Sequence, residues 1–383
     1  MPHSRADGLA GLDTLRAAAI VMVFAYHYMV FVSREPTFGW LSTVGWAGVD
    51  LFFVLSGYLI GNQLFSGVAR GREPSLKAFY ARRFLRTLPN FYVVLALYFL
   101  FPAVMGGRTP PPLWRFLTFT QNIGLQPGTA FSHAWSLCIE EQFYLLLPAL
   151  LVLGLRWRLS VRWGWGLVVG GILGGIVLRS LLWRDNGLEA DRGVIGYMPN
   201  IYYASWARMD EFLPGVAIAL LKNFHPPAWS ALMARGRVLL VAALAALLLL
   251  GWGILQGYYI DGYGYGYFMT GFGYSLLACA FALLVLAALS PQTVLYRWRV
   301  PGAASLAAWS YAIYLTHKPL AFIVQRQLQG TALAGAALPA VVTLVCLAGG
   351  WLLYRAVETP FMRLRQRHVP SNFVLERGLL PAR

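Results

Sequence analysis

The sequence predicts an all-α, polytopic integral membrane protein with about ten transmembrane helices. Three observations lead to this fold class. Of the 383 residues, 58% are hydrophobic and only 12% are charged, about half the charged fraction of an ordinary soluble domain. The apolar residues form blocks long enough to cross a bilayer, such as 238–253, 268–289 and 334–354. Lysine and arginine gather in alternate connections between the blocks, as in multi-pass proteins.

Hydropathy and the positions of glycine, proline and charged residues give the expected order of spans. We place the spans at 14–33, 45–65, 87–104, 134–154, 164–183, 200–221, 238–256, 267–289, 302–323 and 335–356. The connections after the second, fourth, sixth and eighth spans are basic, and so is the segment after the last one. Because basic loops stay on the cytoplasmic side, we expect both termini in the cytoplasm.

The net charge of +16 has a topological explanation. Basic loops on one side of a membrane orient the chain and contact anionic lipid, which accounts for most of the excess. No nucleic-acid-binding motif accompanies the charge, so we expect no nucleic-acid partner. Cys138, Cys279 and Cys346 all lie inside apolar blocks, without the spacing of a disulfide framework or a metal site, and we expect no metal.

The domain organisation follows from the same pattern. Residues 1–360 are expected to form one transmembrane domain, and residues 361–383 a short basic cytoplasmic tail, with no appended extracytoplasmic domain. One outer connection, 257–275, is rich in tyrosine and glycine. This segment is either a belt at the membrane interface, which is the commoner use of such residues, or a platform for stacking carbohydrate.

The first span carries an arginine and a histidine in GLDTLRAAAIVMVFAYHY, residues 11–28. Eleven residues at about 100° each bring Arg16 and His27 to one face of a helix, about 16 Å apart along its axis. Arg16 can extend to the cytoplasmic boundary, as an anchoring arginine does. An imidazole cannot, so His27 is expected to face the bundle interior or a water-filled cavity, where buried ionisable residues are usually functional.

Further polar residues are expected at the depth of His27. In residues 132–148, the side chains of His133, Ser136, Glu140 and Tyr144 follow one another at helical spacing and form one polar face. Asp50 near the outer end of the second span, and His317 and Lys318 in the ninth, complete the set. We expect Asp50, His133, Glu140 and His317 to surround His27. The alternative is that these residues are polar contacts between helices, worth about 1 kcal/mol a pair.

A second group of residues lies at the inner boundary. Arg82, Arg83 and Arg86 in FYARRFLRTLP, residues 79–89, share one helix face, near a helix amino terminus whose dipole adds positive potential. They suit a polyanion such as a phosphorylated cofactor, and Arg16 lies at the same depth. The alternative is that they serve topology alone. Arg208, Asp210 and Glu211 are interpreted as a structural ion-pair group.

Five stretches together resemble the acyltransferase-3 family of membrane-bound O-acyltransferases, many of which acylate sugars on bacterial surface glycans. In chain order they are LDTLRAAAIVMVFAYH, GVDLFFVLSGYLI, ARRFLRTLP, HAWSLCIEEQFYLLLP and SYAIYLTHKPL. The resemblance implies His27 as the catalytic histidine with Arg16 as its partner in the motif. It also implies that Arg82, Arg83 and Arg86 contact an acyl-CoA donor, and that Glu140 lines the site.

The residues and the resemblance together predict a mechanism. Acyl-CoA, with acetyl as the expected acyl group, enters from the cytoplasm and extends its arm up a hydrophilic passage towards His27. His27 then acts as general base on a sugar hydroxyl, and Glu140 or Asp50 orients its ring. An acyl-histidine intermediate is the less favoured variant. His133, Trp135, Ser136, Tyr144, His317 and Lys318 are the expected substrate-binding residues.

The expected setting is the bacterial cytoplasmic (inner) membrane. The acceptor would be a surface polysaccharide, a lipid-linked glycan or a glycosylated metabolite, and a glycan-assembly protein is a possible partner. The main rival function is a transporter or flippase for a glycan or a lipid-linked intermediate, since buried charges and about ten helices suit transport as well.

Overall fold

The structure, a computed structural model, describes residues 10–187, 193–260 and 262–374. These residues fold almost entirely into helices, as predicted. The longer helices are α1 (Ala10–Tyr28), α3 (Gly48–Val68), α4 (Leu76–Leu100), α7 (Trp135–Arg156), α8 (Val161–Asn186), α11 (Leu213–Phe224), α13 (Gly236–Gly257), α14 (Tyr274–Leu289), α16 (Ala303–Leu328), α17 (Leu338–Leu353) and α18 (Thr359–His368).

Short elements connect them. These are α2 (Trp40–Val44), α5 (Pro102–Met105), α6 (Leu113–Leu117), α9 (Gly193–Tyr197), α10 (Ser205–Arg208), α12 (Pro226–Met233) and α15 (Val294–Arg297), with a hairpin of β1 (Tyr259–Ile260) and β2 (Gly264–Tyr265). The two strands are antiparallel, and Tyr259 pairs with Tyr265.

Seven helical stretches in the described part of the chain are long and apolar enough to cross a membrane. They are Ala10–Ser33, Trp40–Val68, Ser132–Arg156, Val161–Asn186, Gly236–Gly257, Met269–Leu289 and Leu338–His368. The chain is therefore a multi-pass, all-α membrane protein. The expected spans at 87–104 and 302–323 lie in α4 and α16, whose polar residues keep them out of this set.

The expected span at 200–221 is not one helix. A π-helical turn, Met198–Tyr202, leads to an extended residue, Ala204, and then to α10, a 3₁₀ turn at Met209–Phe212, and α11. The break lets the guanidinium of Arg208 donate back to the carbonyl oxygen of Tyr202, 3.2 Å away, and reach carboxylates on other elements. The helix is thus interrupted in this segment, and buried ion pairs form at the interruption.

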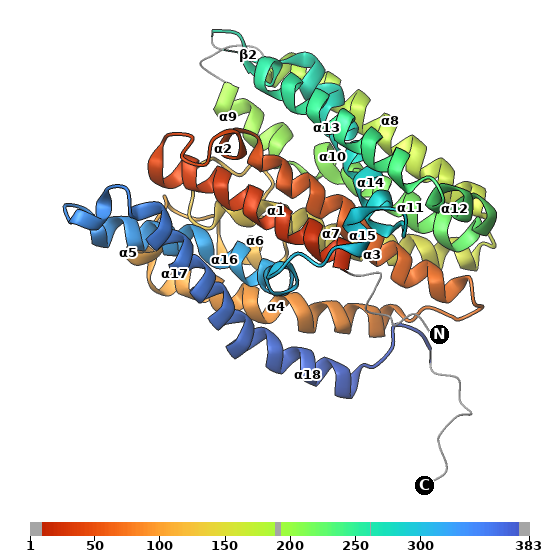
Figure 1. Ribbon diagram of the computed structural model, residues 1–383. Helices are drawn as coiled ribbons and strands as arrows, with labels where there is room; N and C mark the ends of the chain where they lie inside the picture. The colour runs from red at the N-terminus through yellow and green to blue at the C-terminus, as the bar shows by residue number, and fades with distance from the viewer. Residues whose placement is uncertain (1–9, 188–192, 261, 375–383) are drawn as a thin grey trace.

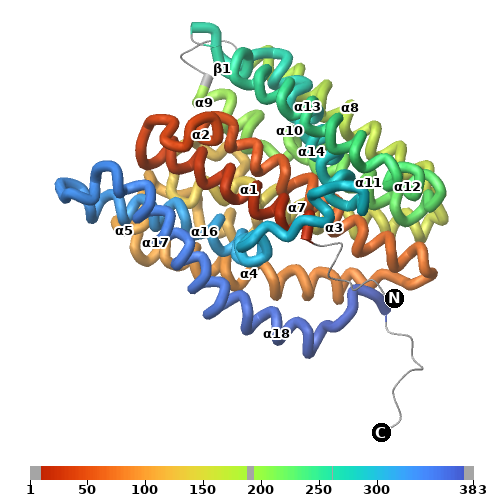
Figure 2. The backbone as a smooth tube through the Cα atoms, viewed as in Figure 1, coloured from red at the N-terminus to blue at the C-terminus, as the bar shows by residue number. Residues whose placement is uncertain are grey.

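The long helices run side by side along a common direction (Figure 1). One end of this bundle carries the β1–β2 hairpin, α2, α5 and α9, and the other carries α12 and α18 (Figure 2). At the second end, the backbone at Pro74 in the basic loop after α3 pairs with Phe373. We call this second end the inner end and the hairpin end the outer end, following the orientation that the charges predict.

Close packing in the bundle centre fixes the helices that carry the candidate site. α1 packs against both α3 and α16, and α3 packs against α7 and α11. Gly57 on α3 and Gly215 on α11 allow the last contact, since a Cβ atom at Gly57 would lie 2.1 Å from the carbonyl oxygen of Phe212. At the inner end, α18 packs against α4, so residues 361–368 of the expected tail form a helix. Residues 375–383 lie outside the described residues.

Candidate active site

Three imidazoles from three helices meet in the outer half of the bundle. His27 comes from α1, His133 from the 3₁₀ turn Ser132–Ala134 that precedes α7, and His317 from α16. The ring of His27 lies parallel to that of His317, and its Nδ1 is 2.6 Å from Nε2 of His317. The ring centroid of His133 is 6.3 Å from that of His27 and 5.4 Å from that of His317. We call these three residues the imidazole cluster.

Hydrogen-bond partners indicate which ring nitrogens of the imidazole cluster carry protons. Nδ1 of His317 lies 3.0 Å from the carbonyl oxygen of Ile313, which can only accept, so Nδ1 carries the proton. Nε2 of neutral His317 then has a free lone pair and accepts from the Nδ1–H of His27. The remaining nitrogen of His27, Nε2, is left as an unprotonated base. This assignment follows from the hydrogen-bond network.

His27 and His133 line a cavity that lies towards the outer end, called here the outer cavity. Its volume is about 670 Å³, which falls within the usual range of small-molecule sites. Lys318 and Trp135, both expected at the site, also line it, whereas the buried His317 lies behind His27. The ammonium group of Lys318 donates to the hydroxyl of Ser132, 3.0 Å away, and lies 4.4 Å from the ring centre of Phe31.

A second cavity of about 100 Å³ lies towards the inner end and is called the inner cavity. Arg16, Arg83 and Arg86 line it, together with Ser136, Glu140 and Tyr144. The guanidinium of Arg83 stacks 3.7 Å from the ring centre of Tyr144, and its buried Nε–H has no acceptor among the described residues. Val49 belongs to the lining of both cavities. Where a single passage was expected, the described residues line these two cavities, which share Val49.

The three arginines of α4 that were expected to contact the donor do not all line the inner cavity. Arg82 does not line the inner cavity, and its guanidinium donates to the backbone carbonyl oxygen of Val369 after α18. The helix α18 brings another arginine, Arg365, close to the arginines of α4. The Nε–H of Arg365 is buried and has no acceptor in the described part of the chain. Sequence reasoning placed Arg365 in a tail, because nothing local shows that this helix folds back on α4.

The two carboxylates expected beside His27 lie elsewhere. Glu140 accepts hydrogen bonds from the hydroxyls of Ser56, at 2.5 Å, and Tyr144, which places it at the inner cavity. Asp50 accepts a hydrogen bond from Arg208, at 3.1 Å, and is fully buried. The partner of His27 is therefore the imidazole of His317 and not a carboxylate. Asp50 and Glu140 were expected to orient His27, but in the structure both carboxylates are held by other donors.

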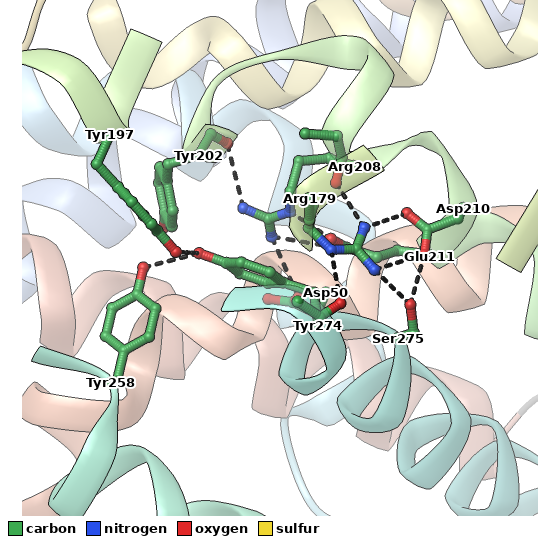
Figure 3. Close-up of polar contacts among 12 residues, drawn as sticks. Asp50, Arg179, Tyr197, Tyr202, Arg208, Asp210, Glu211, Tyr258, Tyr274 and Ser275 are labelled. Carbon is green, nitrogen blue, oxygen red and sulfur yellow. Dashed lines mark hydrogen bonds and ion pairs between the residues drawn. The ribbon is translucent and has the colours of Figure 1, made fainter. Parts of the chain in front are cut away.

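Arg208 is the centre of a buried polar network, shown in Figure 3. Its guanidinium pairs with Glu211 and Asp50, as the ion-pair interpretation of Arg208 and Glu211 predicted. Asp210 instead pairs with Arg179 of α8, at 2.6 Å, and accepts from Ser275 of α14. The aromatic rings around Arg208 include Trp135 and Tyr202, which also line the outer cavity. The network thus supports one wall of that cavity.

The tyrosine-rich segment contributes to the same region. Tyr258 and Tyr274 share a hydrogen bond of 2.8 Å (Figure 3). The ring of Tyr265 stacks 3.6 Å from that of Tyr197. These rings pack inside the protein, whereas Tyr259, Tyr263 and Tyr267 are exposed. The segment is therefore partly a structural core and not solely an interfacial belt.

Two hydroxyl residues of the site were missed from the sequence. Ser56 holds Glu140, and the hydroxyl of Tyr314 donates to the carbonyl oxygen of His133 at 2.6 Å while contacting Ser136 at 2.7 Å. Tyr314 precedes His317 by three residues, so the two side chains lie on the same face of α16. This spacing is the sequence signal that could have identified Tyr314 as a site residue. Ser56 stands in an apolar stretch without any such neighbour.

Comparison with known proteins identifies the family. The acyltransferase-3 family, described as an acyltransferase domain, matches residues 9–355. The peptidoglycan O-acetyltransferase OatA of Listeria monocytogenes is 32% identical over 236 residues, which cover 56% of this chain and 34% of that protein. The putative peptidoglycan O-acetyltransferase YrhL of Bacillus subtilis is 31% identical over 230 residues, covering 56% and 33%.

A putative O-acetyltransferase of Staphylococcus aureus is 28% identical over 230 residues, covering 56% of this chain and 35% of the relative. The chain thus matches about a third of the length of each of these relatives. No solved structure matches it. From the family match along most of its length, the chain belongs to the acyltransferase-3 family.

Proposed function

We propose that this protein is an O-acetyltransferase of the bacterial cytoplasmic membrane, which moves an acetyl group from cytoplasmic acetyl-CoA to a sugar hydroxyl of a surface or lipid-linked glycan. One observation carries the proposal: His27 lines the outer cavity, and its Nδ1 lies 2.6 Å from Nε2 of His317. The tautomers assigned above from this contact leave Nε2 of His27 unprotonated. The names of the relatives, which include peptidoglycan O-acetyltransferases, supply the reaction class.

The proposed reaction is a direct transfer. Nε2 of His27 removes the proton from the acceptor hydroxyl as its oxygen attacks the thioester carbonyl carbon. The carbon–sulfur bond then breaks, the CoA sulfur takes up the proton held by His27, and the acetyl ester remains on the sugar. Such general-base assistance contributes roughly 10²–10⁴-fold to the rate. His317 holds the imidazole in the required tautomer and orientation, which is the role of the third group in a triad.

The donor side of the proposal rests on the inner arginines. Apolar side chains such as Val49, Phe52 and Leu55 line the inner cavity beside the arginines. We therefore assign the pantetheine arm to the inner cavity and the phosphates to its mouth. Arg16, Arg83 and Arg86 line this cavity, and the buried Nε–H groups of Arg83 and Arg365 lack acceptors among the described residues. Unpaired guanidinium donors of this kind suit phosphate oxygens.

Val49 lies in the linings of both cavities, between the position assigned to the thioester and His27. The proposal therefore includes a movement of the Val49 side chain when the donor binds. A donor-bound structure in which the two cavities join at Val49 is the expected result.

The test compares two histidine variants in purified, lipid-reconstituted protein. His27→Ala should lower kcat at least about 100-fold, since the general base is lost. His368→Ala is the matched control, because His368 is exposed on α18 and lines neither cavity. Thiol release from acetyl-CoA and the mass of the acetylated sugar are measured together. Full turnover by a folded His27→Ala protein would refute the base assignment.

The same assay separates the transferase from its rival, a glycan transporter. Movement of a labelled glycan across a proteoliposome membrane without any thiol release would support transport. Thiol release that requires a second, glycan-assembly protein would assign the final step to that partner.

A further inference from the structure

The outer cavity carries positive charge and, among the described residues that line it, no carboxylate. Lys318 lies deep in it, beside the imidazole cluster, while Arg34 and Arg108 are exposed at its opening. A cavity lined by one sign of charge concentrates ligands of the opposite sign. The proposed reaction uses none of these three cations, so they call for an explanation of their own.

Lys318 is the best placed of the three to meet a ligand. Its ammonium group is bound to the Ser132 hydroxyl and faces the ring of Phe31, and it forms no ion pair with the residues described here. An ammonium group without a counter-ion inside a membrane protein is costly. A ligand anion in the cavity would supply the missing charge.

The rest of the lining suits a sugar ring. Trp135, Tyr202 and Tyr203 present aromatic surface, and the three rings pack within 5.4 Å of one another, measured between centroids. Nδ1 of His133 is buried and has no partner among the described residues, while its Nε2 lies 3.3 Å from the carbonyl oxygen of Leu315. Nδ1 of His133 is therefore an acceptor that no donor among the described residues satisfies.

We propose that the outer cavity binds an anionic sugar as the acyl acceptor, with the carboxylate or phosphate of that sugar held by Lys318, Arg108 and Arg34. The inference rests on the proposed function and narrows its acceptor class. Each charge-assisted contact favours a charged ligand over a neutral one of the same shape.

The test measures binding, which does not depend on turnover. The protein is placed in nanodiscs of zwitterionic lipid and titrated by calorimetry. The first probe pair is a tetrasaccharide of alternating glucuronate and N-acetylglucosamine, and the same tetrasaccharide with its carboxylates reduced to alcohols. The second pair is glucose 6-phosphate and glucose, which tests phosphate as the source of the charge.

The charged member of at least one pair should bind about tenfold more tightly than its neutral partner, and this ratio should fall with added salt. Arg34→Gln combined with Arg108→Gln should reduce the ratio, and Lys318→Met should reduce it further. Arg326→Gln is the matched control, since Arg326 lies on the same helix as Lys318 but does not line the cavity. It should keep the ratio of the unmodified protein.

Equal binding of charged and neutral probes in both pairs, or no binding of any probe, overturns the inference. A loss of preference in Arg326→Gln as large as in the double variant overturns it too. Selective binding without acetyl transfer would support the anion site while refuting the proposed transferase. Transfer to neutral and charged sugars with equal KM would leave the transferase intact and refute the anion site.

Discussion

At the scale of single residues, the contact between His27 and His317 decides how the proposed base works. His317 carries its proton on Nδ1, towards Ile313, and therefore presents Nε2 to His27. In His317→Leu this acceptor is lost, the His27 ring is free to change tautomer, and kcat should fall about 10–100-fold with little change in the KM of the sugar.

His317→Gln is the matched variant, because its side-chain oxygen can occupy the position of Nε2 and accept from the same N–H. It should recover part of the lost kcat, and the pH profile of kcat should move back towards that of the unmodified protein. If the Leu and Gln variants have the same kcat and the same pH profile, His317 contributes packing alone.

The arginines of α4 offer a second comparison between neighbours. Arg83 lines the inner cavity, whereas Arg82 is bound to the backbone after α18. Removing one charge-assisted phosphate contact costs about 1.5–3 kcal/mol. Arg83→Gln should therefore raise the KM for acetyl-CoA by about tenfold or more, and Arg82→Gln should raise it much less. Initial rates at varied acetyl-CoA check this, and equal effects of the two changes would argue against the donor site.

At the scale of the elements, the break between α10 and α11 depends on Arg208. Arg208→Met leaves Asp50 and Glu211 buried without their cation, and loss of one partner of a buried pair typically costs about 3–5 kcal/mol. The melting temperature, followed by tryptophan fluorescence, should fall clearly. Adding Asp50→Asn and Glu211→Gln to Arg208→Met should restore part of it, since neutral amides tolerate burial better than lone carboxylates. No recovery in the triple variant would show that the network is not what holds the break.

The same elements show which features of the site could be predicted from the sequence and which could not. Arg16 and His27 share a face of α1, and both line cavities, because helical periodicity is a local property. Asp50 was matched to His27 by depth alone. Its direction around the helix axis depends on how α3 packs against the broken segment, which no local pattern specifies. Asp210 likewise pairs with Arg179 and not with Arg208, because the 3₁₀ turn directs neighbouring carboxylates to different helices.

At the scale of the whole molecule, the all-α membrane fold and the family were predictable, since both rest on hydropathy and ordered motifs. The packing of α18 against α4 and the shapes of the two cavities were not, because both arise from contacts between distant segments. The charge pattern predicts that the β1–β2 hairpin faces outwards and the loop after α3 faces the cytoplasm.

This orientation can be checked with single cysteines in a background without Cys138, Cys279 and Cys346. A membrane-impermeant thiol reagent applied to intact cells should label Tyr263→Cys, at the exposed hairpin, and spare Arg70→Cys. After the cells are opened, both should react. Labelling of Arg70→Cys in intact cells would reverse the assignment of inner and outer ends.

The apolar side chain of Val49, which lies in the linings of both cavities, has a consequence for a protein in a membrane. A water-filled passage open from one side of the lipid to the other would conduct ions and dissipate the gradients that the membrane maintains. An apolar residue between two cavities would limit such leakage at rest. In the proposed transfer, the acetyl group would pass Val49 only during a brief opening, so that few ions could follow.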